Sequence, residues 1–110
     1  MSESIKLIYK ILKILENSMD YPELDVDRLS PEALGTSLNR RNAILEMLLK
    51  KGYIDGIAIK KYVDEESSVI LGLENIKITI DGLEYLEDNS LMKKAANLAK
   101  GIAEIINWHI

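Results

Sequence analysis

Apolar residues near the start of the chain recur at the spacing of an α-helix. They are Ile5, Ile8, Ile11, Leu12 and Leu15, with Leu7 and Ile14 widening the stripe. The polar residues of this segment, Lys6, Lys10, Lys13 and Glu16, fall towards the other side. The pattern predicts a helix over residues 3–17 whose broad apolar face lies in the core. Residues 17–27, which contain Pro22 and four acidic residues, are predicted to form a loop with room for a short strand.

A short helix is predicted next, because Ser30, Pro31 and Glu32 suit a first helical turn. The serine hydroxyl caps free backbone amides, proline fits the first helical position, and glutamate suits the positive end of the helix dipole. Gly35 ends this helix after little more than one turn.

A longer helix is predicted to start from a cap at Thr36 or Ser37 and to run to about Lys51, with Gly52 just past its end. Its inward residues are expected to be Leu38, Ile44 or Leu45, and Leu48. Its outward residues are expected to be Asn39, Arg40, Ala43, Glu46 and Lys50. The two helices and the glycine turn between them make a helix-turn-helix pattern.

After Gly52 the spacing of apolar residues changes from the 3.6-residue period of a helix towards the two-residue period of a strand. The alternating sets are Ile57 and Ile59, then Val69, Leu71 and Leu73, then Ile76, Ile78 and Ile80. Because β-branched residues are dense here, the pattern predicts two or three short antiparallel strands around an acidic turn at 64–68.

Another helix is predicted after the strands, with Thr79 as its N-cap and Asp81 in its first turn. Gly82 stands where a side chain would crowd the junction between strand and helix. We expect this helix to break at Asn89 and Ser90 and a last helix to span residues 91–109.

This order of elements indicates an α+β fold of the winged-helix class. A helix-turn-helix is followed by a two- or three-stranded antiparallel wing and an added C-terminal helix. We expect a winged-helix-like domain over residues 1–89. Residues 90–110 would then form a helix packed on this domain or on a second subunit.

Two segments resemble known sequences. Leu48-Leu49-Lys50-Lys51-Gly52-Tyr53-Ile54 resembles the end of a winged-helix third helix entering its wing. The segment running from Ile78 to Asn89, ITIDGLEYLEDN, with Met92-Lys93-Lys94-Ala95 after it, resembles the C-terminal signature of the YjcQ family. That resemblance covers nearly the whole chain and implies a winged-helix-like fold and a phage or prophage context in Gram-positive bacteria. It supplies no activity and no catalytic residues.

The composition excludes several classes of protein. The chain of 110 residues has no cysteine and one histidine, His109, which rules out a disulfide scaffold, a thiol nucleophile and any mechanism that needs two imidazoles. No run approaches the roughly 18 apolar residues needed to span a bilayer, and the amino end lacks a signal-peptide core, so we expect a cytoplasmic protein without a membrane partner.

The net charge of −4 is unevenly divided along the chain. Residues 31–62 carry a net charge of +3, and residues 63–90 carry −7. Only the basic block has the charge to bind nucleic acid, because affinity for nucleic acid comes largely from basic side chains that displace counterions.

Double-stranded DNA is therefore the first predicted partner, bound by a regulator or accessory protein. The candidate DNA-binding residues are Asn39, Arg40, Arg41, Ala43, Glu46 and Lys50 on the third helix, with Lys60 and Lys61 on a strand. Arginine grips guanine, asparagine pairs with adenine, and the two strand lysines would reach flanking phosphates. The sequence leaves open which of Arg40 and Arg41 is exposed. Glu46 on this face, and the acidic wing tip Asp64-Glu65-Glu66, stand against the hypothesis.

The alternative is a non-DNA-binding adaptor for a phage or host protein, since winged helices also serve as docking domains. The last helix has a small-residue surface that suits self-association into a homodimer. The candidate self-association residues are Leu98, Ala99, Ile102, Ile106 and Trp108. Packing of this helix against the first helix of its own chain is the other option.

We expect no enzyme activity, no cofactor and no metal site. Glu65 and Glu66 are neighbours in a turn and do not form a pair across a cleft. The acidic loop at 20–27 lacks the central glycine and the terminal glutamate of a calcium loop.

Overall fold

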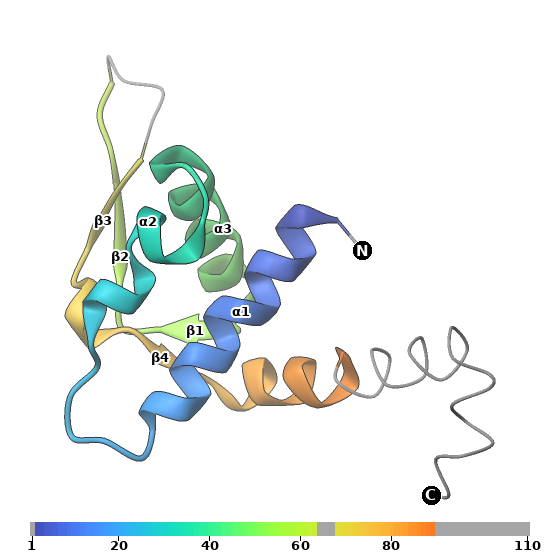
Figure 1. Cartoon of the computed structure of the whole chain (residues 1–110). Coiled ribbons are helices and arrows are strands. Elements are labelled where there is room, and N and C mark those ends of the chain that lie inside the picture. The colour runs from blue at the N-terminus through green and yellow to red at the C-terminus, as the bar shows by residue number, and fades with distance from the viewer. Residues whose placement is uncertain (1, 64–67, 90–110) are drawn as a thin grey trace, which may run out of the picture.

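The computed structural model describes residues 2–63 and 68–89, which form an α+β arrangement of helices and small antiparallel sheets compatible with a winged helix (Figure 1). Helix α1 (Glu3–Ser18) lies across one side, and the short helix α2 (Pro31–Leu34) and helix α3 (Leu38–Lys51) lie above it in the view of Figure 1. The predicted last helix over 91–109, the acidic wing tip and Ser90 lie outside the described residues. A break was predicted at Asn89 and Ser90, but Asn89 is still helical.

The predicted first helix is confirmed. Ser2 caps it by accepting a hydrogen bond from the Ile5 amide at 3.1 Å, and Leu7, Ile11, Leu12 and Leu15 are buried. The predicted loop after it contains no strand. It ends in the 3₁₀ helix η1 (Val26–Leu29), whose Leu29 is buried in the core.

The predicted helix-turn-helix is confirmed at its caps. The Ser30 hydroxyl accepts from the Ala33 amide, and Ser37, the second of the two candidates, accepts from the Arg40 amide, both at 3.1 Å. Gly35 ends α2 at φ 70°, a left-handed conformation that favours glycine.

The third helix buries Ile44, Leu45 and Leu48 as predicted, but the inward prediction for Leu38 is wrong. Leu38 is 53% exposed, because it is the first residue of the helix and lies outside the packed turns.

The described residues contain four short strands where two or three were predicted, since the strand before Ile57 was missed, and they form two antiparallel pairs. Strand β1 (Ile54–Asp55) pairs with β4 (Lys77–Ile78), and β2 (Ala58–Lys61) pairs with β3 (Ser68–Leu71) as a hairpin beside α3. The sequence pattern predicted strand structure as far as Leu73 and again at Ile80, and both predictions are wrong. After β3, Gly72 turns the chain at φ 76° into the 3₁₀ helix η2 (Leu73–Asn75), and Ile80 is the first residue of the next helix, not part of a strand.

One core joins the helices to strands β1 and β4. The largest fully buried side chains come from α1, η1, α3 and β1; they are Ile11, Leu12, Leu29, Ile44, Leu45 and Ile54. Burial of such side chains is the main favourable term of folding.

The helix over 80–89 starts as predicted. The Thr79 hydroxyl accepts from the Gly82 amide at 3.1 Å and donates to the Gly52 carbonyl at 2.5 Å, and the Thr79 amide donates to the Tyr53 carbonyl at 3.1 Å. Gly82 packs directly on the Tyr53 backbone. A Cβ there would meet the Tyr53 carbonyl oxygen and would lie 2.7 Å from the Ile78 Cγ1 atom.

Replacing Gly82 with alanine therefore tests this contact. We expect Gly82→Ala to lower the free energy of unfolding by about 2 kcal/mol through overpacking, although alanine is the better helix former. The measurement is urea denaturation. Gly35→Ala is the control, since nothing lies within 4 Å of the added Cβ and only the left-handed φ costs about 1 kcal/mol. Equal losses in the two variants would contradict the close approach.

Candidate nucleic-acid interface

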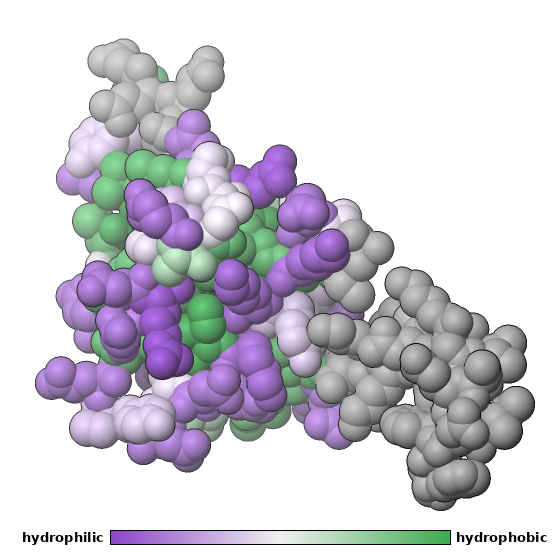
Figure 2. All heavy atoms as spheres, in the orientation of Figure 1, coloured by the Kyte–Doolittle hydropathy of each residue, from purple (hydrophilic) through white to green (hydrophobic). Residues whose placement is uncertain are grey.

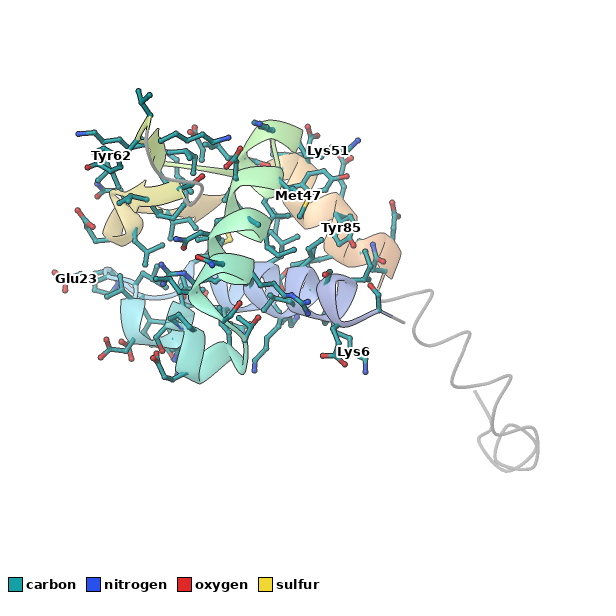
Figure 3. All side chains as sticks on the ribbon, turned by 90° about the horizontal axis from the view of Figure 1, so that it is seen from above. Lys6, Glu23, Met47, Lys51, Tyr62 and Tyr85 are labelled. Atoms are coloured by element: carbon teal, nitrogen blue, oxygen red, sulfur yellow. The ribbon has the colours of Figure 1, made fainter. Side chains whose placement is uncertain are left out.

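The exposed side of α3 carries most of the residues predicted to face DNA. Asn39, Arg40, Ala43 and Lys50 are exposed, as predicted. Met47 and Lys51 are also exposed on α3 and were missed as candidate site residues. Figure 3 looks onto this side, with Met47 and Lys51 labelled.

Arg41 is turned away from this side, so Arg40 is the exposed arginine. The Arg41 guanidinium donates to the Leu29 carbonyl at 3.1 Å and, through two nitrogens, to the Asn42 side-chain oxygen at 3.1 and 3.0 Å. Burial of the guanidinium lowers the pKa of Arg41 from its ordinary value. These contacts bind η1 to α3 and explain the position of Arg41 without a ligand.

Asn42 is a buried polar residue that sequence reasoning missed. Its side-chain nitrogen donates to the Ser68 carbonyl at 3.0 Å, which ties the centre of α3 to the first residue of β3. The available signal was an amide on the apolar side of the helix, three residues before Leu45.

Glu46 does not stand in the middle of the outer side, as the sequence suggested, but at its edge beside the hairpin. Its carboxylate lies 3.0 Å from Lys50 Nζ and 3.0 Å from Lys61 Nζ, and accepts from the Ser68 hydroxyl at 3.1 Å. Its side chain is 15% exposed, whereas both lysines are largely in solvent. The hydrogen bonds from Lys61 and Lys50 lower the pKa of Glu46 to about 2.

In the described part of the chain, the basic residues of α3 and the hairpin are of two kinds, those whose charge has a partner and those whose charge has none. Lys50 and Lys61 share one carboxylate, and Lys60 lies 5.1 Å from the centre of the Tyr62 ring. Among the residues that the structure describes, Arg40 and Lys51 form no ion pair, so their charges stay available on the surface.

The hairpin adds apolar surface next to this basic side. Val63 is fully exposed, and Tyr62, Val69 and Leu71 are each more than a third exposed. Figure 2 shows hydrophobic atoms reaching the surface near the hairpin among hydrophilic ones.

Residues 2–63 and 68–89 were also searched for a metal site and for a membrane-spanning helix. Within this part of the chain, no three His, Asp or Glu side chains come together in a way that would hold a metal ion. No helix there is long and apolar enough to cross a membrane. The self-association residues Leu98, Ala99, Ile102, Ile106 and Trp108 lie outside the described residues.

Comparison with known proteins gives a match to a protein family. The family described as YjcQ protein matches residues 9–105 of the chain. Neither the curated proteins nor the solved structures yield a significant match.

The pKa of Glu46 makes a pH-dependent prediction. Because this pKa lies below its ordinary value of 4.5, the ionised carboxylate stabilises the fold above about pH 4.5, and this contribution is lost as pH falls towards 2. We expect Glu46→Gln to be about 1 kcal/mol less stable than the wild type at pH 6, a modest value because the lysines lie in solvent. Denaturation at several pH values measures the difference, which should vanish near pH 2.

The control is Glu16→Gln, which removes an exposed ion pair with Lys13 on α1. A difference between wild type and Glu46→Gln that stays constant down to pH 2 would show that the carboxylate charge is not what holds the hairpin.

Proposed function

The chain belongs to the YjcQ family, and we propose that it is a winged-helix protein that binds double-stranded DNA as a phage or prophage regulator or accessory protein. We propose no catalytic role for it.

The observation that carries the proposal is the charge on the exposed side of α3. This side presents Arg40, Lys50 and Lys51, and the acidic residue of the helix, Glu46, is turned towards the hairpin. A helix about 10–12 Å wide fits the major groove of B-DNA, which is about 12 Å wide. Basic side chains on such a helix displace counterions from the phosphates.

The winged-helix interpretation is supported by the hairpin beside this helix. Asn42 and Glu46 of α3 both bond to Ser68 of β3, so helix and hairpin form one unit. In a winged helix bound to DNA through its third helix, a hairpin in this place lies over the neighbouring backbone, where Lys60 and Lys61 would meet phosphates.

On this proposal, the exposed residues of α3 and the hairpin have different roles. Asn39 is the candidate for pairing with an adenine edge, and Ala43 and Met47 offer apolar contact to thymine methyl groups. Lys50, Lys51, Lys60 and Lys61 neutralise phosphates. Arg41 is withdrawn from the DNA-binding set, since its guanidinium is occupied by Leu29 and Asn42.

Glu46 acts against DNA binding in this arrangement. Its carboxylate neutralises part of the charge of Lys50 and Lys61, the two lysines that lie between helix and hairpin. Removal of that carboxylate would raise the net charge of the face by one, so its loss should strengthen DNA binding while it weakens the fold.

A second candidate function is docking on another protein. The apolar surface of the hairpin favours it, because contiguous exposed apolar residues such as Val69 and Leu71 mark interaction sites. An adaptor of this kind predicts no binding to DNA at any salt concentration.

The test is fluorescence anisotropy with a labelled random duplex. We expect binding at about 50 mM salt and a steep loss of affinity as salt rises. Lys51→Ala and Lys60→Ala should each weaken binding about two- to fivefold, the range of an exposed ion pair, whereas Glu46→Gln should strengthen it. Absence of binding at low salt would overturn the proposal in favour of the adaptor.

Lys77→Ala is the matched control. It removes the same charge from an exposed lysine of β4, which lies on the far side of the core from α3 beside the loop at 19–24. An equal loss of affinity in Lys77→Ala and Lys51→Ala would mean that binding follows total charge and not this face.

The predicted homodimer is a separate proposal. We expect size-exclusion chromatography with light scattering to give a dimer for the wild type and a monomer for Ile102→Asp, because a charge in an apolar interface is costly. A wild-type monomer at high concentration would contradict it.

A further inference from the structure

A basic cleft lies on the side of α3 away from the hairpin. Its volume is about 220 Å³, and it is an open cleft lined by the first half of α1, the end of α2 and the start of α3. Leu7 and Leu34 are its buried apolar residues, and Lys6, Lys10, Thr36 and Arg40 are polar residues around it. Segments about 30 residues apart in the sequence thus bring three basic side chains to one small cleft.

The cleft carries more positive charge than its own residues neutralise. Its acidic residue is Glu3, whose carboxylate lies 3.8 Å from Lys6 Nζ in an exposed pair. Lys10 Nζ donates to the Ala33 carbonyl at 3.3 Å, which holds its ammonium over the carboxyl half of α2. With three cations and one anion, the cleft has a net charge of +2 that favours an anionic ligand.

We propose that this cleft binds one backbone phosphate of double-stranded DNA. The inference rests on the proposed function and extends it by naming a second flank for the interface. Arginine presents a planar fork of N–H donors that matches phosphate oxygens, lysine binds them as a point charge, and the Thr36 hydroxyl adds a donor.

The position of the cleft relative to α3 supports a backbone phosphate in particular. A helix in the major groove has a phosphate strand on each side, because the two strands bound the groove. Lys6 and Tyr62 lie on opposite sides of α3 in Figure 3, and in Figure 1 α1 and the hairpin likewise flank it. The hairpin lysines would therefore meet one strand and the cleft would meet the other.

This assignment changes the expected role of Arg40. The sequence suggested a contact with guanine, which would make the effect of Arg40 depend on DNA sequence. A phosphate contact carries no sequence information, so its loss weakens binding to all duplexes alike.

The experiment measures the affinity of the full chain for several duplexes of different sequence over a range of salt concentrations. We expect Lys6→Ala and Arg40→Ala each to weaken binding about two- to fivefold. The loss should be the same for every duplex, and the slope of log affinity against log salt should fall by about 1 for the lost phosphate contact. Both residues are exposed and make no contact that holds the core, so both variants should keep the wild-type circular dichroism and Tm.

Lys13→Ala is the matched control on the same helix. Lys13 pairs with Glu16 and does not line the cleft, so its removal should leave both the affinity and the salt slope nearly unchanged. Wild-type affinity in Lys6→Ala, or a loss in Arg40→Ala confined to particular duplexes, would overturn the phosphate assignment while leaving DNA binding by α3 in place. Failure of the wild type to bind any duplex at low salt would overturn both.

Discussion

The positions of the hairpin and of η1 against α3 depend on one buried amide, that of Asn42. Its nitrogen donates to Ser68 at the start of β3, and its oxygen accepts from Arg41, which in turn reaches the carbonyl of Leu29. A buried amide without partners costs about 1–3 kcal/mol, so this chain of bonds fixes where the hairpin and η1 sit against α3. No buried side-chain polar atom lacks a partner in the part of the chain that the structure describes.

Between α3 and the hairpin, a contact that stabilises the fold also weakens the proposed binding of DNA. Glu46 holds the hairpin to the helix through Lys61 and Ser68, and in doing so it neutralises charge that a DNA-binding face needs. A surface optimised for affinity alone would carry no carboxylate between its lysines. The low pKa of Glu46 means that this compromise holds over the physiological pH range, so pH does not switch it.

Local signals in the sequence predicted the elements and their ends, but not the partners of the polar side chains. Ser30, Ser37 and Thr79 were identifiable as caps because capping involves residues two or three positions away. Glu46 was assigned to the outer side, and the choice between Arg40 and Arg41 was left open, because helical phase alone does not show the contacts with Lys61 and Leu29, which are distant in the sequence. The alternation at Leu73 and Ile80 failed for the opposite reason: the local pattern continued where a left-handed Gly72 and the Thr79 cap ended the strands.

The residues on the exposed side of α3 indicate which kind of DNA-binding protein this chain would be. Base pairs are distinguished mainly by side chains that donate or accept hydrogen bonds in the major groove. On this face Ala43 and Met47 have no such groups, Asn39 is the one side chain that we assign to a base edge, and the remaining candidates are cations on the helix, in the cleft and on the hairpin. Contacts with phosphates supply affinity without sequence information. The proposed interface is therefore better suited to an accessory protein that grips the backbone of many sequences than to a repressor that selects one operator.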